Sequence, residues 1–383
     1  RPYRGDVVSF TMQSCPGITV TPEHPLLTPD GWQPAASIQI GDKLVLPIPI
    51  ATGRTQLDLA DEAENLLVST RSKAGAVYNY QQASNQDEKH VWTTNSSNRV
   101  RRFIPLSPDA MWLFGLFVAE GYTTGSPNRG SRTVGFALGK HEHDLIEHIA
   151  CIGAETFGVP TFTKERRTTM TVYLSSALLA RVFRGWFGHR AHTKRLPPWL
   201  FEVNNELLWH FLQGYLAGDG YRSPINGWRG ATVSKTLACQ LRIVAAAVGG
   251  RCLIWPKEQK TTQIEGRLIS GHRVYEWGMA RSVDRWALVR SPFLALPVRA
   301  VNKKPYEGFV HNIEVAEDHS YVDGLIAVHN CFDGLKEPSL NLGHVPEDKL
   351  LDIWRGEKLK TLTETHNAGR RPELPLCKVC SFA

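Results

Sequence analysis

Residues 113–122 read Leu-Phe-Gly-Leu-Phe-Val-Ala-Glu-Gly-Tyr, and residues 212–221 read Leu-Gln-Gly-Tyr-Leu-Ala-Gly-Asp-Gly-Tyr. Each stretch ends an apolar segment with an acidic residue followed by Gly-Tyr, and each has small residues four positions apart. Small residues at that spacing share one helix face and let two helices approach until their backbones nearly touch. The sequence therefore predicts two paired helices that bring Glu120 and Asp219 together.

The ends of these helices are a poor place for two lone carboxylates. The C-terminus of a helix already carries partial negative charge, and like charges at close range repel each other. A hard divalent cation prefers oxygen ligands and would remove the repulsion. Such an ion can also activate water and stabilise charge on a phosphodiester. We therefore expect Glu120 and Asp219 to bind a hard divalent cation, the plain alternative being two ordinary exposed acids at helix ends.

The sequence around the two motifs follows one plan twice, which predicts an α+β fold for residues 106–290. Ser107 before Pro108 suits the start of the first helix, because Ser caps helices and Pro is favoured at their first position. Apolar periodicity and Gly or Pro punctuation predict the remaining elements. We expect helices at 108–120, 141–157, 205–220 and 235–248, and strands at 132–138, 168–174, 230–233 and 272–279.

This part of the chain resembles the LAGLIDADG homing endonucleases. The resemblance implies a monomer with an internal pseudo-dimer that straddles double-stranded DNA. It makes Glu120 and Asp219 the catalytic acids and implies that they bind Mg²⁺. The block Lys194-Arg195-Leu196-Pro197 is similar to the Lys-x-[Ile/Leu]-Pro block of the family, in which the lysine assists cleavage. The resemblance assigns that role to Lys194, the alternative being a surface lysine, and Lys235 is a weaker candidate.

Recognition of DNA in this family uses β-strands in the major groove, where cationic and amide side chains reach base edges. The resemblance implies contacts of this kind from several basic side chains. The candidates are Arg132, Lys164, Arg166, Arg167, Arg229 and Arg273.

The segments on either side of residues 106–290 have a different sequence pattern. Residues 1–50 and 291–330 consist of short β-type runs punctuated by Gly and Pro, which predicts an all-β domain split by the insertion. Residues 51–105 are polar, with the basic run Arg99–Arg102. This stretch is expected to be a linker or a DNA-recognition region, and its basic run to be either a solvated loop or a DNA contact.

Residues 329–331, His-Asn-Cys, have a chemistry of their own. The side-chain amide of Asn330 can attack its own main-chain carbonyl, form a succinimide and break the bond to Cys331. A neighbouring histidine accelerates this step by proton transfer. The Cys331 thiol can accept an acyl chain.

The two β-rich flanks resemble the Hedgehog/intein splicing fold. Thr21-x-x-His24 is similar to an upstream splicing motif, and residues 310–331 to the C-terminal one. The resemblance gives Thr21 and His24 a role in the N-to-S acyl shift, gives His319 and His329 roles in the later steps, and makes Asn330 the cyclising residue. Asn312 stands where some inteins carry Asp, so no acid is expected there.

An intein begins with Cys or Ser, whereas this chain begins at Arg1, 20 residues before Thr21. We therefore expect the first nucleophile to lie upstream of the sequence. The chain as written is then unable to splice and can at most cleave between Asn330 and Cys331.

Residues 331–383 resemble the SPASM segment of radical S-adenosylmethionine enzymes. The resemblance rests on a Leu-Gly turn at 342–343, a helix expected at 346–354 and a final Cys-x-x-Cys. It makes Cys331, Cys377 and Cys380 ligands of a 4Fe-4S cluster in the intact host protein, since thiolates suit such clusters. A zinc site or a redox pair at the Cys-x-x-Cys is the alternative.

Composition is consistent with this organisation. The chain has 383 residues, enough for several domains, a net charge of +7 and a pI of about 9.0, which suits a polyanionic partner. No apolar run is long enough for a membrane span, and seven irregularly spaced cysteines favour a reducing cytoplasm. Two rival functions remain open: a DNA-binding regulator without splicing chemistry, and an inactive insertion in an iron–sulfur enzyme.

Overall fold

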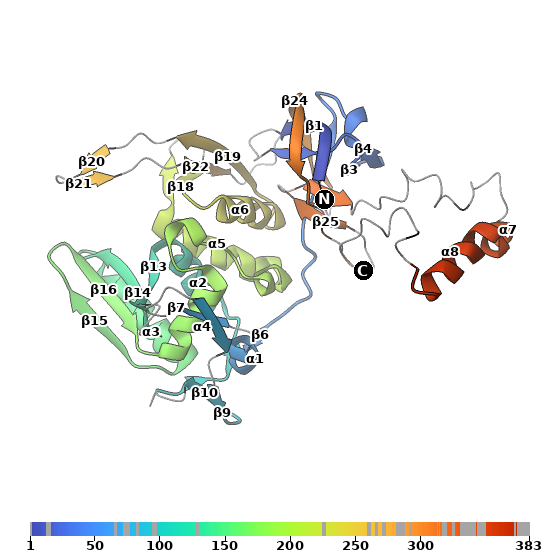
Figure 1. Ribbon diagram of the computed structural model, residues 1–383. Coiled ribbons are helices and arrows are strands. Elements are labelled where there is room, and N and C mark those ends of the chain that lie inside the picture. Colours follow the sequence, from blue (N-terminus) through green and yellow to red (C-terminus); the bar gives the residue numbers. More distant parts are fainter. Residues whose placement is uncertain are drawn as a thin grey trace.

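The computed structural model describes most of the chain (Figure 1). Helices are interspersed with strands, and the described strand pairings are antiparallel, as expected for an α+β protein. The described residues are 2–12, 17–64, 67–71, 77–81, 84–93, 98–126, 130–223, 227–258, 262–264, 267–269, 273–280, 288–290, 293–311, 313, 315, 320–323, 326–329, 342, 350–370 and 373.

The two ends of the insertion are joined by one β-domain. Strand β1 (Pro2–Met12) pairs antiparallel along its whole length with β24 (Phe293–Phe309), from the other side of the insertion. Strand β24 also pairs with β5 (Lys43–Pro47). The remaining strands of this sheet are β2 (Ile18–Val20) and β23 (Leu288–Arg290).

A second sheet of this β-domain again combines both flanks. Its strand order is β25 (Ser320–Asp323), β26 (Ile326–His329), β3 (Pro25–Thr28) and β4 (Gly31–Pro34). Gly31 and Gly41 both have positive φ, a conformation that favours glycine. One apolar core holds the two sheets together. Its buried members from the flanks are Val8, Phe10, Met12, Ile18, Leu26, Ala35, Ile38, Leu44, Leu46, Leu294, Leu296, Val298, Ile326 and Val328.

The insertion contains two units with the same sheet topology. The sheet orders are β13-β14-β16-β15 in the first unit and β17-β18-β22-β19 in the second. The first unit consists of α2 (Pro108–Glu120), β13 (Gly121–Ser126), β14 (Gly130–Gly139), α3 (His143–Phe157), β15 (Thr161–Glu165), β16 (Thr169–Leu174) and α4 (Ala177–Phe187). The second consists of α5 (Asn205–Asp219), β17 (Tyr221–Ser223), β18 (Gly227–Thr232), α6 (Lys235–Ala247), β19 (Arg251–Glu258), β20 (Thr262–Ile264), β21 (Arg267–Ile269) and β22 (Arg273–Ala280).

Helix ends follow local chemistry closely. The Ser107 hydroxyl accepts a hydrogen bond from the Ala110 amide, which confirms the predicted cap of α2. Helix α4 is not among the helices expected from the sequence. Its signals are a capping serine, Ser176, and Gly188 directly after its last residue.

Residues 51–105 are more ordered than the expected polar linker. They form β6 (Gln56–Asp58), α1 (Leu59–Glu64), β7 (Leu67–Arg71), β8 (Val77–Gln81), β9 (Ser84–Gln86), β10 (His90–Thr93), β11 (Val100–Arg101) and β12 (Phe103–Pro105). Seven of their side chains are buried in the core of the two units: Leu57, Leu59, Ala60, Ala63, Val91, Val100 and Ile104. The guanidinium of Arg102 binds the Asp58 carboxylate, so this part of the basic run is used inside the protein.

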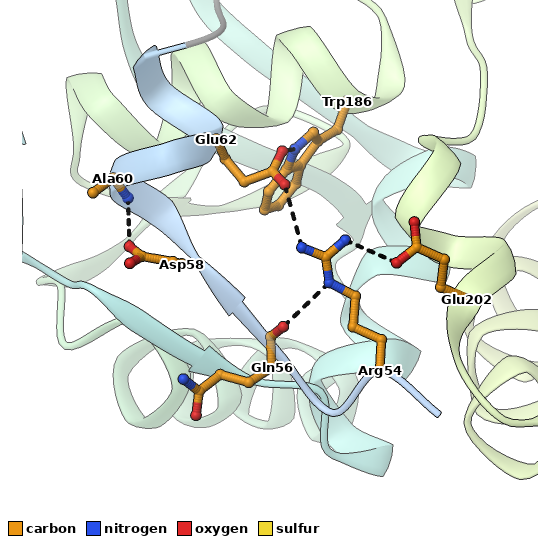
Figure 2. Close-up of polar contacts among 7 residues, drawn as sticks. All are labelled: Arg54, Gln56, Asp58, Ala60, Glu62, Trp186 and Glu202. Carbon is orange, nitrogen blue, oxygen red and sulfur yellow. Dashed lines mark hydrogen bonds and ion pairs between the residues drawn. The ribbon is translucent and has the colours of Figure 1, made fainter. Parts of the chain in front are cut away.

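Ion pairs and hydrogen bonds of residues 52–54 hold the segment that leaves the β-domain against the insertion. Figure 2 shows the Arg54 guanidinium between two carboxylates, with 3.0 Å from Nη1 to Oε2 of Glu202 and 4.0 Å from Nη2 to Oε1 of Glu62. The Trp186 indole on α4 donates to Glu62 (2.7 Å). The carbonyl of Glu202, at the end of η3 (Pro198–Glu202), accepts from the amides of residues 52–54. These contacts fix where the connecting segment meets the insertion.

Near the C-terminus the structure describes α7 (Leu350–Arg355) and α8 (Glu357–Asn367), which contact each other and are drawn apart from the two units in Figure 1. Helix α7 overlaps the expected helix at 346–354 and ends one residue beyond it, while α8 was not expected. Among the described residues, no helix has the length and hydropathy to cross a membrane.

Candidate functional site

Helices α2 and α5 pack backbone against backbone. A Cβ added at Gly115 would lie 2.7 Å from the Tyr215 amide nitrogen and closer still to the Phe211 carbonyl oxygen. A Cβ at Gly214 would lie 2.7 Å from the carbonyl carbon of Trp112. The helices can adopt this spacing only because glycine has no side chain, as the small-residue pattern predicted.

This contact brings Glu120 and Asp219 together at the paired helix ends. Burial raises the pKa of Glu120, and the charges of Asp219 and Glu142 raise it further, while Lys194 lowers it. Burial also raises the pKa of Asp219, which the hydroxyl of Tyr215 and the charge of Lys194 partly counteract. Both carboxylates are therefore held in surroundings that disfavour their negative charge, as argued from the sequence.

Lys194 is buried, 8% exposed, and lies at the end of α2. Its Nζ donates to the carbonyls of Phe117 and Gly121, both at 2.8 Å, and lies over the Phe117 ring. Burial lowers the pKa of Lys194 to about 8, although Asp219 and Glu120 both raise it. Lys194 is thus not a surface lysine: it places a cation beside the acids and ties the last turn of α2 to the residue that follows it, through two backbone carbonyls.

The second unit holds the Lys194 segment in place. The Ser234 hydroxyl, which caps α6, donates to the Lys194 carbonyl (2.6 Å) and accepts from the Leu237 amide. The Gln240 side chain accepts from the Leu196 amide and donates to its carbonyl. Sequence reasoning missed both supporting side chains, and the only signal for Ser234 was its position as a helix cap.

The donor set suits a hard divalent ion that is completed by substrate. Among the described residues, no group of three His, Cys, Asp or Glu side chains is placed to hold a metal. Glu120 and Asp219 therefore provide two carboxylates. Mg²⁺ is typically bound by one or two carboxylates, waters and the phosphates of a substrate. The residues fit that ion, and they would leave positions for phosphate oxygens.

The expected base-contacting residues differ in their surroundings. Lys164, Arg166 and Arg167 are exposed around the turn between β15 and β16. Arg273 is paired with Glu258 at 2.6 Å. Arg229 is half-buried, Lys235 is exposed at the first turn of α6, and the side chain of Arg132 lies outside the described part of the chain.

In the β-domain, two of the expected splicing residues lie close together: His329 ends β26, and His24 directly precedes the neighbouring strand β3. Val328 of β26 pairs with Leu26 of β3, which places His329 near His24, and burial lowers the pKa of His24. Thr21 is buried, and its carbonyl accepts from the His24 amide at 3.0 Å. The ring of Trp32 meets His329 edge-on, with centroids 5.2 Å apart.

The other residues predicted to act in splicing or to bind a cluster lie outside the described residues. They are Asn312, His319, Asn330, Cys331, Cys377 and Cys380.

Residues 321–381 match the family model SPASM, an iron–sulfur cluster-binding domain. This finding confirms the predicted resemblance of the C-terminal segment. The match begins at Tyr321, before the expected boundary at Cys331.

Curated relatives share the larger part of the chain. An ATP-dependent DNA helicase of Thermococcus kodakarensis is 29% identical over 281 residues, or 66% of this chain and 24% of the helicase. An uncharacterised protein of Methanocaldococcus jannaschii is 25% identical over 259 residues, or 60% of this chain and 29% of that protein. A DNA polymerase of Thermococcus hydrothermalis is 22% identical over 298 residues, or 65% of this chain and 17% of the polymerase. The chain spans less than a third of the length of each of these relatives.

Among solved structures, the homing endonuclease I-DmoI in complex with DNA and Mn is 17% identical to the chain, with a TM-score of 0.31. That match covers 46% of this chain and 90% of the endonuclease. I-WcaI bound to its DNA recognition sequence is 13% identical, with a TM-score of 0.28, and the match covers 45% of this chain and 76% of that protein. Scores this low do not by themselves establish a shared fold.

Proposed function

We propose that the two units form a divalent-metal-dependent DNA endonuclease of the LAGLIDADG type, with Glu120 and Asp219 as its catalytic acids. The observation that carries the proposal is the pairing of α2 and α5, which brings two buried carboxylates together at adjoining helix ends. A protein keeps such a repulsive arrangement where a cation relieves it. The excess of basic residues supports a polyanionic substrate.

The chain's own residues would divide the work. Glu120 and Asp219 would hold Mg²⁺, which would supply Lewis acidity and activate a water at the phosphodiester. Lys194 keeps the end of α2 in position through two carbonyls and adds positive charge where the phosphate gains negative charge. Basic side chains along the sheets then bind the DNA backbone and base edges.

A cleavage assay on duplex DNA from the uninterrupted host gene tests this proposal. We expect Mg²⁺-dependent double-strand cleavage by the unmodified chain, and loss of cleavage with retained binding for Glu120→Gln and Asp219→Asn. Glu147→Gln is the matched control, because Glu147 is an exposed acid on α3 and its replacement changes the charge equally. Binding without metal-dependent cleavage would instead support the DNA-binding regulator.

We further propose that residues 1–330 are an intein that carries this endonuclease, and that residues 331–383 belong to an iron–sulfur host protein. Two observations support this proposal. The flanking segments meet in one β-domain, in which His329 ends β26 and His24 directly precedes the neighbouring strand β3. The relatives also carry different names, a helicase and a polymerase, so what they share with this chain is not explained by one host activity.

Intact mass measured over time tests the splicing chemistry. We expect slow release of residues 331–383 from the folded chain, slower release for His329→Ala and none for Asn330→Ala. A mass that stays constant for the unmodified chain would contradict cleavage at Asn330.

The proposed ligands of a 4Fe-4S cluster are Cys331, Cys377 and Cys380, with zinc at the Cys-x-x-Cys as the alternative. Iron, sulfide and zinc content of the complete host protein distinguishes the two. Iron without DNA cleavage or chain cleavage would favour the inactive insertion.

A further inference from the structure

The first unit carries a row of aromatic side chains across the open face of its sheet. Tyr122 of β13 pairs with Gly135 of β14, Gly135 pairs with Tyr173 of β16, and Tyr173 pairs with Phe162 of β15. Paired residues in antiparallel strands share one face. Helices α3 and α4 contact β16 and β14 of this sheet. The neighbours of Tyr173 along β16, Val172 and Leu174, belong to the buried core, so the aromatic row lies on the opposite face of the sheet.

This row is pre-organised by direct contacts. The Tyr122 hydroxyl donates to the Tyr173 hydroxyl at 3.1 Å. Phe162 stacks on Tyr173, with ring centroids 4.9 Å apart and an interplanar angle of 23°. A Cβ at Gly135 would lie 2.9 Å from the Tyr122 ring, so glycine leaves the space that this ring occupies. Tyr173 packs against one face of the Phe162 ring, and the Phe162 side chain remains 48% exposed.

The surroundings of this row are basic. Lys164, Arg166 and Arg167 are exposed beside it, and Arg166 hydrogen-bonds the Tyr173 hydroxyl. An exposed phenylalanine between cations is unsuited to an apolar protein partner but suits the major groove of DNA. The grooves present polar base edges, and the thymine C5-methyl is the apolar group that the major groove displays.

The corresponding row of the second unit is different. Tyr221 pairs with Arg229, Arg229 with Gly278, and Gly278 with Leu253. In the second unit, Arg229 stands where the first unit has Gly135, and Gly278 stands where it has Tyr173. The two sheets therefore present different chemistry to the two halves of a bound duplex.

We propose that Phe162, supported by Tyr173, is a specificity-determining residue that contacts a thymine methyl group in the half-site bound by the first unit. This inference rests on the proposed function as a DNA endonuclease and adds one recognised group to it. Replacing thymine by deoxyuridine removes the methyl and leaves every hydrogen-bonding group of the base in place.

The experiment uses duplexes that the full chain selects from a randomised library. Each thymine of the selected sequence is replaced in turn by deoxyuridine, and Kd is measured for the unmodified chain, Phe162→Ala and Phe162→Leu. We expect one replacement in one half-site to weaken binding by the unmodified chain about fourfold, the equivalent of about 0.8 kcal/mol for one buried methyl-sized group. Phe162→Ala should bind thymine and deoxyuridine duplexes equally, and Phe162→Leu should restore part of the difference.

The outcomes separate the inference from the function on which it rests. If no sequence is enriched, the proposed DNA-binding function fails, and this inference fails with it. If a sequence is enriched but no methyl matters, or if Phe162→Ala keeps the same preference as the unmodified chain, only the inference is overturned. Thermal unfolding of each variant checks that the fold is retained.

Discussion

Replacing Gly214 by alanine tests the close helix packing directly. The added Cβ would lie 2.7 Å from the carbonyl carbon and 3.0 Å from the Cα of Trp112, where ordinary contact begins at 3.4 Å. The obstacle is the backbone of α2, which cannot rotate away as a side chain can. Overpacking of this kind costs up to about 3 kcal/mol. Alanine gains about 1 kcal/mol over glycine in helix propensity, which leaves a net loss of about 2 kcal/mol.

Two measurements check this expectation. At about 2–4 °C per kcal/mol for a domain of this size, Tm should fall by about 4–8 °C. Moving the helix ends apart also displaces Glu120 relative to Asp219, and a misplacement of about 1 Å can lower a rate about a hundredfold. We therefore expect metal-dependent DNA cleavage to fall by on the order of a hundredfold.

Gln213→Ala is the control, since Gln213 is the exposed neighbour of Gly214 on the same helix. It should change neither Tm nor cleavage by more than a small amount. If the helices need the backbone contact at Gly214, alanine lowers Tm; if they do not, the higher helix propensity of alanine raises Tm. A Gly214→Ala variant with a raised Tm and full cleavage would show that the glycine is only tolerated and that the helices need no backbone contact.

Three further predictions concern buried charge and the connecting segment. Because the pKa of Asp219 is raised in the folded state, its ionisation destabilises the metal-free protein as pH rises above the ordinary pKa of about 4. In the presence of chelator at pH 7, Asp219→Asn should therefore be more stable than the unmodified chain. This difference in the free energy of unfolding should vanish at low pH. The unfolded chain keeps the Lys194 proton up to its ordinary pKa of about 10.4, whereas the folded chain loses it from about 8. The stability of the unmodified chain should therefore rise between these values in urea titrations, and Lys194→Met should not show that rise. Arg54→Met removes two partly exposed ion pairs and should lower the free energy of unfolding by less than about 1 kcal/mol, measured by urea unfolding.

The sequence predicted the parts of the fold that depend on local rules. Ser107 and Pro108 marked the start of α2, and the spacing of small residues predicted the contact between α2 and α5. Helix α4 was missed although its local signals are present: Ser176 caps it, and Gly188 follows its last residue. The packing role of residues 51–105 depends on scattered apolar side chains such as Leu57 and Val91, which only the assembled core makes meaningful.

The two acids of the candidate site could be predicted from the sequence, but the groups that hold Lys194 and Leu196 in position could not. A repeated acidic motif pointed to Glu120 and Asp219 because the same pattern occurs twice. The two carbonyls that bind Lys194, and the clamp of Gln240 on Leu196, depend on residues far apart in the sequence meeting in space. No local pattern encodes such meetings.

The pairing of Pro47 with Phe293 has a consequence for how such a chain could arise. Strand β5, where the polypeptide leaves the β-domain, pairs directly with β24, and only the short edge strand β23 precedes β24 in the returning chain. The nuclease therefore occupies the position of a hairpin loop. Among the described residues, Ala246 is the one nuclease side chain buried in the β-domain's core, and Cys239 and Ile243 of the same helix pack against that core. A gene that gained or lost the intervening coding sequence would therefore leave the connectivity of the host module intact. A short turn joining Pro47 to Phe293 removes β23 with the nuclease and should leave a smaller protein that still folds.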